Sequence, residues 1–121
     1  MDILLKALAD ITRLRIINLL KEKELCVCEL EVILDMSQSN VSRHLSRLRA
    51  EKIISFDRRG QWIHYHINPD FIKENHLLYQ YLKEKMKNPA LFDKDLKRLE
   101  QYKRSRESCE TLKTKQEIIF F

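Results

Sequence analysis

Apolar residues recur at helical spacing through the first third of the chain. Between Ile3 and Leu20 they follow the three- and four-residue intervals of amphipathic helices. Asp10 interrupts this run, and an aspartate there can cap a second helix that starts at Ile11. Residues 25–34 then carry one short apolar helical face. The pattern therefore predicts three short helices in succession.

A turn and a further helix follow. Residues 35–37 predict the turn, and Ser37 or Ser39 is expected to cap a helix that ends at residues 51–52. This helix has a single narrow apolar stripe at the i, i+4 and i+7 positions. The stripe consists of Val41, Leu45 and Leu48. Two short helices joined by a tight turn predict a helix-turn-helix.

The period changes from helical to alternating after residue 53. Residues 54–56 and 63–67 alternate apolar and polar side chains, which predicts two antiparallel strands. Residues 57–60 are expected to form the turn, with Gly60 supplying a positive φ. A hairpin directly after a helix-turn-helix predicts the wing of a winged helix-turn-helix.

Helical spacing returns over residues 71–86 and again over a charged segment from 91 to about 115. Asn88-Pro89 separates the two, because proline disfavours helical geometry in the residue before it. The fold class is therefore mostly α with a two-stranded β-wing. We divide the chain into a winged helix-turn-helix domain for DNA binding and dimerisation, residues 1–88, and a C-terminal helical extension, residues 89–121.

Composition narrows the function classes. The 121 residues are 44% hydrophobic and 34% charged, with one glycine, two prolines, three cysteines and a net charge of +5. Phosphate loops and dinucleotide folds need several glycines, so Gly60 alone excludes them. No apolar run approaches the roughly 20 residues of a membrane span, and no signal peptide follows Met1. Three cysteines are too few for a disulfide framework, which fits a cytoplasmic protein. The missing glycine motifs argue against kinases and oxidoreductases, so we expect that the chain is not an enzyme.

The face of the 38–50 helix opposite its apolar stripe carries short polar side chains and two arginines. Arginine can read guanine, and asparagine can read adenine, in the major groove. Amides at the helix start can also hold a phosphate. The alternative is an ordinary solvated face. The candidate DNA-contacting residues of this helix are Ser37, Gln38, Ser39, Asn40, Ser42, Arg43, His44, Ser46 and Arg47.

Charge is concentrated in the same region. Residues 37–67 hold six basic and two acidic side chains, a net charge of +4. Arg58 and Arg59 fall at the predicted hairpin tip, where they can contact phosphates or a minor groove. An exposed basic turn that contacts nothing is the alternative.

Histidines offer a weaker signal for metal binding. His64 and His66 are two apart on a strand and so face the same way, but no third ligand stands nearby in the sequence. We therefore expect solvent-facing strand residues. His44 flanks the apolar stripe, where it is expected to pack or to touch a phosphate.

Three segments resemble the ArsR/SmtB family of metal- and metalloid-responsive repressors. They are residues 8–16 (LADITRLRI), 24–30 (ELCVCEL) and 37–45 (SQSNVSRHL), in family order and at family spacing. The likeness covers about residues 3–86. It implies a winged-helix homodimer whose interface is formed by the first and post-wing helices, here residues 2–9 and 70–86. The Glu-Leu-Cys-Val-Cys string is typical of the arsenic-sensing and cadmium/lead-sensing branches.

The chain departs from the family pattern at several points. Many arsenic sensors have a third cysteine where this chain has Glu31. The N-terminal cysteine arm of cadmium/lead sensors is missing before Met1. The Asp/His set that zinc and nickel sensors carry on the post-wing helix looks absent, since residues 71–86 offer only His76 with two glutamates. The tail beyond residue 89 exceeds the family core and contains Cys109.

The resemblance implies that Cys26 and Cys28 bind As(III) or Sb(III). As(III) is soft and prefers three thiolates, so Cys109 is a candidate third ligand. Residues i and i+2 point about 200° apart in a helix but to one side on extended backbone, so chelation is expected to need an extended or unwound turn. A helix N-terminus at this point is expected to lower the cysteine pKa. The alternative is a pair of small buried hydrophobic residues.

The expected function is a dimeric repressor that binds double-stranded operator DNA and leaves it when As(III) or Sb(III) binds cysteine thiolates, with no organic cofactor and no membrane partner. Three alternatives stay open: a Cd/Pb-responsive repressor, a thiol-redox-responsive repressor and a winged-helix DNA- or protein-binding adaptor without an inducer. A thiol enzyme has the weakest support, because the spacing suggests no His/Asn partner for a nucleophilic cysteine.

Overall fold

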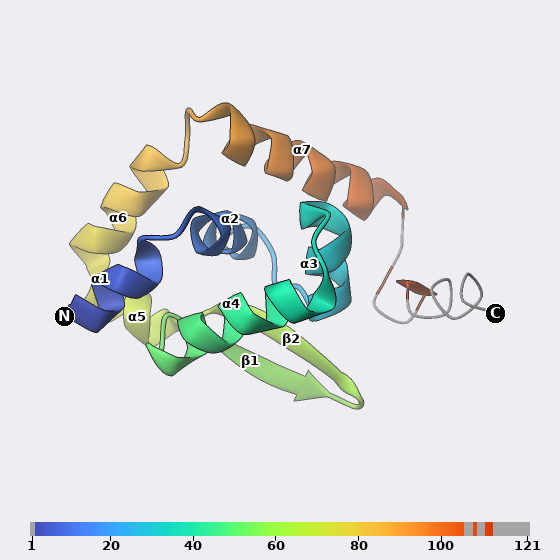
Figure 1. Ribbon diagram of the computed structural model, residues 1–121, viewed down its shortest axis with the longest axis horizontal. Coiled ribbons are helices and arrows are strands. Elements are labelled where there is room, and N and C mark those ends of the chain that lie inside the picture. Colours follow the sequence, from blue (N-terminus) through green and yellow to red (C-terminus); the bar gives the residue numbers. More distant parts are fainter. Residues whose placement is uncertain (1, 106–107, 109–110, 113–121) are drawn as a thin grey trace.

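A computed structural model describes residues 2–105, 108 and 111–112, and these form seven helices and one two-stranded sheet. Cys109 lies outside the described residues. No described helix is long and apolar enough to span a bilayer. The elements, in the order shown in Figure 1, are α1 (Asp2–Leu8), α2 (Ile11–Leu20), α3 (Val27–Leu34), α4 (Gln38–Ala50), β1 (Ile54–Arg59), β2 (Trp62–Ile67), α5 (Pro69–Glu74), α6 (His76–Lys85) and α7 (Ala90–Ser105).

The break between α1 and α2 falls where the sequence predicts it. Asp10 is the N-cap of α2, and its carboxylate accepts a hydrogen bond from the backbone amide of Arg13 at 3.0 Å. The Arg13 side chain reaches back and donates to the carbonyl of Ala7 at 2.5 Å. This one arginine therefore fixes the angle between the first two helices.

Helices α3 and α4 form the helix-turn-helix. Ser37 is the N-cap of α4 and accepts a hydrogen bond from the amide of Asn40 at 3.3 Å. The predicted apolar stripe is confirmed, because Val41, Leu45 and Leu48 are all buried in the core that α4 shares with α2 and α3. Burial of this stripe turns the opposite face of α4 outward.

The wing is confirmed, but its strands are longer than predicted. The antiparallel pairing continues from Ile54↔Ile67 to Arg59↔Trp62, so residues 57–59 belong to β1 and not to the turn. The turn itself is the two residues between the strands, with Gly60 at φ +63°. The strands are longer because a two-residue turn allows cross-strand pairing to continue to the hairpin tip, which keeps the polar residues 57–59 paired.

The post-wing segment is two helices and not the single helix predicted over residues 71–86. Asn68 caps α5 by accepting a hydrogen bond from the amide of Asp70 at 3.1 Å, and Pro69 occupies the first turn, where proline is tolerated. The chain leaves helical geometry at Asn75, with φ −124° and ψ 44°, before α6 begins. Asn75 ends one helix and starts the next, because its amide donates to the carbonyl of Phe71 and its carbonyl accepts from the amide of Tyr79, both at 2.9 Å.

Helix α7 packs along one side of α2 and α3, as Figure 1 shows. Asp95 is fully buried and accepts two hydrogen bonds from the guanidinium group of Arg15, at 2.8 and 3.0 Å. The Asn18 side chain donates to the carbonyl of Phe92 at 3.1 Å. These contacts join α7 to residues that lie about 75 positions earlier in the chain.

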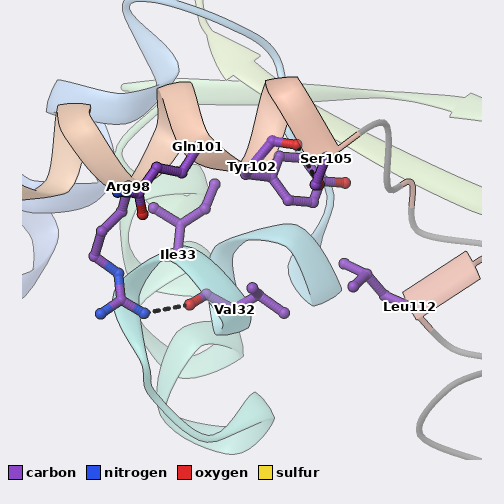
Figure 2. A pocket seen from close by; sticks show the side chains of 7 residues that line it. All are labelled: Val32, Ile33, Arg98, Gln101, Tyr102, Ser105 and Leu112. Carbon is purple, nitrogen blue, oxygen red and sulfur yellow. Dashed lines mark hydrogen bonds between the residues drawn. The ribbon is translucent and has the colours of Figure 1, made fainter.

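Helix α7 ends at Ser105 and does not continue to residue 115 as predicted. The Ser105 hydroxyl donates to the carbonyl of Tyr102 at 2.6 Å, a local bond that competes with helical backbone bonds. Farther on, Leu112 is buried in the core, and with Val32, Ile33, Arg98 and Tyr102 it lines a cleft of about 400 Å³ between α3 and α7 (Figure 2). Arg98 crosses this cleft and donates to the carbonyl of Val32 at 2.8 Å.

Loss of the buried Arg15–Asp95 ion pair is expected to lower the free energy of unfolding far more than loss of an exposed ion pair. Arg15→Ala leaves a buried carboxylate without its cation and is expected to lower the free energy of unfolding by about 3 kcal/mol. Lys97→Ala is the matched control, because its ion pair with Asp93 on the same helix is 74% and 56% exposed. That change is expected to cost about 0.5 kcal/mol. Urea unfolding measures both, and equal losses would contradict the packing of α7 described here.

Candidate DNA interface and thiol site

The outer face of α4 is polar and solvent-exposed. Ser42 is half-buried, whereas the other candidate DNA-contacting residues of this face are exposed. The exposed residues are Ser37, Gln38, Ser39, Asn40, Ser46, Arg43 and Arg47. The guanidinium group of Arg43 donates to Asn40 Oδ1 at 3.2 Å, so one turn of α4 presents an arginine fork and an amide together. These are the two side-chain types that read purine edges in the major groove.

His44 faces the other way. Its side chain is only 8% exposed, and its Nδ1 lies 3.3 Å from Nη1 of Arg13 and 3.9 Å from the Asp10 carboxylate. Burial, together with the charges of Arg43 and Arg13, lowers the pKa of His44 despite the opposing charge of Asp10. Of the two expectations for His44, packing and phosphate contact, the structure therefore favours packing. The neutral ring of His44 joins α4 to the start of α2.

The wing arginines are exposed, but Arg59 is paired. Its Nη1 lies 2.5 Å from the Glu24 carboxylate, which belongs to the segment before α3. At the base of the wing, Arg49 of α4 lies over the ring of Phe56 at 4.2 Å from the ring centroid. The wing is thus attached at its base to α4 and near its tip to the segment before α3.

The two neighbouring cysteines lie at the start of α3. Cys26 is the N-cap, with extended backbone at φ −96° and ψ 172°, and Cys28 lies in the first turn. Their Sγ atoms are 3.5 Å apart. Only Cys28 is helical, and the extended backbone at Cys26 turns both sulfurs to the same side, so the extended turn that chelation is expected to need is already present.

Glu29 was not singled out from the sequence, yet it organises this turn. Its buried carboxylate accepts a hydrogen bond from the backbone amide of Cys26 at 3.0 Å. It also accepts one from the hydroxyl of Tyr102 on α7. The signal in the sequence is the glutamate three residues after the N-cap, as in a capping box. The contact with Tyr102 has no local signal.

The pKa of Cys28 is raised, whereas the sequence predicts a lowered cysteine pKa at this helix N-terminus. Burial, reinforced by the negative charge of Glu29, raises the pKa of Cys28 to about 11, so the helix N-terminus does not lower it. Burial also raises the pKa of the neighbouring Glu31. Cys28 is a free thiol, whereas Cys26 is disulfide-bonded, so a ligand that needs both sulfurs requires Cys26 in its reduced form.

A cleft of about 320 Å³ opens over the two sulfur atoms. Its lining comes from three functional elements: the start of α3, the first residue of α4 and the wing. The lining residues are Cys26, Val27, Cys28, Glu31, Gln38, Gln61, Trp62 and Ile63. A ligand held by the thiols would therefore touch the candidate DNA-reading helix and the wing at once.

Large apolar side chains are exposed on the two elements expected to form a dimer interface. Ile3 and Leu5 of α1 are 57% and 46% exposed, and Leu77 and Tyr81 of α6 are 84% and 57% exposed. Figure 1 shows α1 and α6 at the same end of the molecule, away from the wing tip.

An exposed arginine-bearing helix, a two-stranded wing and an apolar α1/α6 surface define a winged helix-turn-helix DNA-binding protein. The pattern of the bacterial regulatory protein arsR family matches residues 10–55. The solved transcriptional regulator HlyU from Vibrio vulnificus is 35% identical, with a TM-score of 0.55 over 66% of this chain and 83% of that one. The chain belongs to the ArsR family of bacterial regulatory proteins.

Two further relatives are informative. The arsenical resistance operon repressor of Escherichia coli is 49% identical over 67 residues, 54% of this chain and 57% of the relative. The chain thus spans little more than half the length of that relative. A homodimeric winged helix-turn-helix DNA-binding domain from Mycobacterium bovis is 25% identical, with a TM-score of 0.60 over 69% of this chain and 78% of that one. The first two relatives are named as transcriptional regulators and the third as a DNA-binding domain of a possible one, which agrees with the expectation that the chain is not an enzyme.

The raised pKa of Cys28 predicts an unusual pH dependence of alkylation. In Cys26→Ser/Cys109→Ser, the rate of reaction with iodoacetamide is expected to rise about tenfold per pH unit from pH 7 through pH 9, because only the thiolate reacts. A free cysteine levels off near its pKa of about 8.5 and serves as the control. Mass spectrometry of the quenched reaction gives the rates, and a plateau below pH 8 would contradict the burial of this thiol.

Proposed function

We propose that the chain is a dimeric transcriptional repressor that binds operator DNA and is released when As(III) or Sb(III) binds its cysteine thiolates. The observation that carries the proposal is the pair of sulfur atoms 3.5 Å apart beneath a cleft shared with α4 and the wing. Bonds from thiolate sulfur to a metal are about 2.3 Å long in zinc sites, so one ion of similar size can contact both sulfurs without movement of α3. The name of the Escherichia coli relative, an arsenical resistance operon repressor, supports repression and this class of inducer.

Once a reductant has returned Cys26 to the thiol form, the binding chemistry balances with no further redox partner. Arsenous acid exchanges its hydroxyl groups for thiols, and each exchange forms one As–S bond and releases one water molecule. Cys26 and Cys28 supply two sulfurs, and Cys109 is our proposed third ligand because As(III) prefers three thiolates. The third position that arsenic sensors of this family often fill with cysteine is Glu31 here, on the wall of the same cleft.

Dimerisation follows from the exposed apolar surface. Burial of Leu77 and Tyr81 of α6 together with Ile3 and Leu5 of α1 against a second copy removes this surface from water. A two-fold dimer would set the two α4 helices on half-sites about 34 Å apart, one turn of DNA, and the operator would be nearly palindromic. The homodimeric relative from Mycobacterium bovis supports this arrangement.

The cleft provides the route from inducer to DNA. An arsenic atom on Cys26 and Cys28 would take up part of the cleft that Gln38 and Ile63 also line. Gln38 is the first residue of α4, where a phosphate contact is proposed, and Ile63 belongs to the wing. Occupation of the cleft therefore disfavours the arrangement of α4 and wing that fits DNA, and release is driven by the difference in inducer affinity between the two arrangements.

Arsenite titration of a chain–DNA complex tests the proposal. The probe is a duplex selected from a random-sequence library by the chain itself, and fluorescence anisotropy follows its release in the presence of a phosphine reductant. Cys28→Ser is expected to bind the duplex like the unmodified chain and to need at least tenfold more arsenite for release, because one of two preorganised sulfurs is lost. Lys97→Ala, which removes an exposed side chain of α7 outside the cleft, is the control and should leave the response unchanged.

The same titration separates the alternatives. Release by Cd(II) and not by arsenite would identify a Cd/Pb-responsive repressor. Release by peroxide before reductant is added, with no response to arsenite, would favour the redox alternative, for which the disulfide at Cys26 is the supporting observation. Retention of DNA under all three treatments would leave the adaptor without an inducer as the better description.

The division of labour between α4 and the wing is also testable. Arg43→Ala is expected to cost about 1–3 kcal/mol on the selected duplex and to relax its sequence preference, because this arginine is the proposed base reader. Arg58→Ala/Arg59→Ala should weaken binding to all sequences and flatten the salt dependence, as expected for lost phosphate contacts. Anisotropy at several salt concentrations gives both quantities, and a wing variant that changed the preferred sequence would reverse the assignment.

A further inference from the structure

The segment before α3 forms a third extended chain beside the wing. Leu25 and Tyr65 exchange two backbone hydrogen bonds, Leu25 N–H to Tyr65 O at 3.1 Å and Tyr65 N–H to Leu25 O at 2.8 Å. In an antiparallel pair this register sets the preceding residue, Glu24, opposite His66. Glu24 and His66 therefore project from the same face of this three-chain arrangement.

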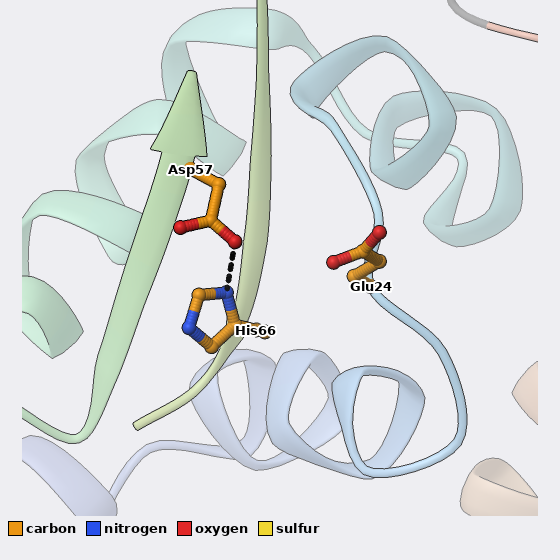
Figure 3. Close-up of side chains that lie close together, drawn as sticks. All are labelled: Glu24, Asp57 and His66. Carbon is orange, nitrogen blue, oxygen red and sulfur yellow. Dashed lines mark ion pairs between the residues drawn. The ribbon is translucent and has the colours of Figure 1, made fainter. Parts of the chain in front are cut away.

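Asp57 of β1 projects from that face as well. In the wing, Asp57 pairs with His64 and Ser55 pairs with His66, so all four side chains share one side of the hairpin. Figure 3 shows Asp57 and His66 on neighbouring strands with Glu24 on the adjoining segment. One oxygen of each carboxylate and one nitrogen of His66 lie within 4.8 Å of one another. The sequence shows no third ligand near His64 and His66, because Glu24 lies about 40 residues away and only the strand register brings it to His66; His64 is not part of the group.

The His66 ring is held by one nitrogen and has the other unsatisfied. Its Nε2 lies 2.7 Å from the hydroxyl oxygen of Ser55. Its Nδ1 is buried from solvent and has no hydrogen-bond partner, and the nearest Asp57 oxygen is 3.8 Å away, too far for a hydrogen bond. With the proton on Nε2 donated to Ser55, the lone pair of Nδ1 is directed toward the two carboxylates. In metal-binding histidines, the ring nitrogen that does not bind the metal usually donates a hydrogen bond, and that bond fixes the tautomer.

We propose that Glu24, Asp57 and His66 form a binding site for a divalent transition-metal ion of the zinc class, distinct from the thiol site. One imidazole and two carboxylates are nitrogen and oxygen ligands of the kind that bind such ions, and three protein ligands leave a position for water. Asp57 is exposed and His66 is half-buried, so the ion exchanges with solvent. The ligands come from three paired segments, so a bound ion would clamp the wing to the residues that lead into α3.

Arg59 is the competitor for this site. Its guanidinium group forms an ion pair with the Glu24 carboxylate at 2.5 Å. Glu24 has to break that ion pair before its carboxylate can coordinate a metal ion. Metal binding therefore releases an arginine near the wing tip. Removal of Arg59 should tighten metal binding, a result that a merely structural role for the three ligands does not predict.

Zinc binding by the full-length chain tests the proposal without any use of DNA. All three cysteines are first replaced by serine, so that thiolates do not bind the ion, and Zn²⁺ is titrated in competition with a fluorescent chelator. His66→Gln is expected to weaken binding at least tenfold. His76→Gln, which changes an exposed histidine on α6, is the matched control and should bind zinc like its parent. Arg59→Ala should bind several-fold more tightly.

The imidazole nitrogens identify the ligand atom directly. In the same cysteine-free chain, nitrogen-15 spectra of the histidine rings should show zinc shifting Nδ1 of His66, with Nε2 still protonated. Zinc affinity that survives His66→Gln, or a shift confined to His64 or His76, would overturn the proposal. These outcomes are independent of the arsenite response, which depends on the cysteines that this background lacks.

Discussion

The backbone pair between Leu25 and Tyr65 is the constraint on which the functional geometry depends. Its two hydrogen bonds join the end of the α2–α3 connection to the middle of the wing. One residue before it, Glu24 faces the wing histidine, and one residue after it, Cys26 caps α3. A single extended residue thus fixes the distance from the thiols to the wing. Because Leu25 is itself buried, this pairing is protected from water and sets the relative position of the elements on either side.

The C-terminal helix adds a second fixed point to the same turn. Glu29 is buried, and a buried carboxylate is costly unless its oxygens accept hydrogen bonds. One bond comes from the Cys26 amide and another from Tyr102 of α7, which lies outside the 10–55 segment matched by the family. Helix α7 therefore contributes to the cysteine-bearing end of α3 and does not merely cover it. The same negative charge helps to keep Cys28 protonated, so an inducer that replaces thiol protons is favoured over reagents that need a preformed thiolate.

The sequence predicts those parts of the molecule that depend on local chemistry. Asp10 and Ser37 cap their helices through side-chain bonds to amides three residues away, and the stripe from Val41 to Leu48 marks the buried face of α4. Gly60 marks the hairpin turn. Each of these features arises within a few residues, where propensity and periodicity apply.

The features that the sequence did not predict are long-range. Tyr102 meets Glu29 across 73 residues, and Glu24 meets His66 only through strand register. The pKa of Cys28 depends on burial by surrounding elements, which outweighs the local effect of the helix N-terminus. The break at Asn75 was missed because apolar spacing continues across it, so periodicity alone gave one helix where the backbone forms two.

Hydrogen exchange at the amides of Leu25 and Tyr65 tests most directly whether the thiol site and the wing act as one unit. The amide of each residue donates to the carbonyl of the other. Their protection from exchange therefore measures how stably the segment before α3 stays paired with the wing. With reduced cysteines, added arsenite is expected to accelerate exchange of both amides by a common factor of several-fold, while the buried Ile17 amide of α2 keeps its rate. Unchanged exchange at Leu25 and Tyr65 under conditions where arsenite releases DNA would contradict the account.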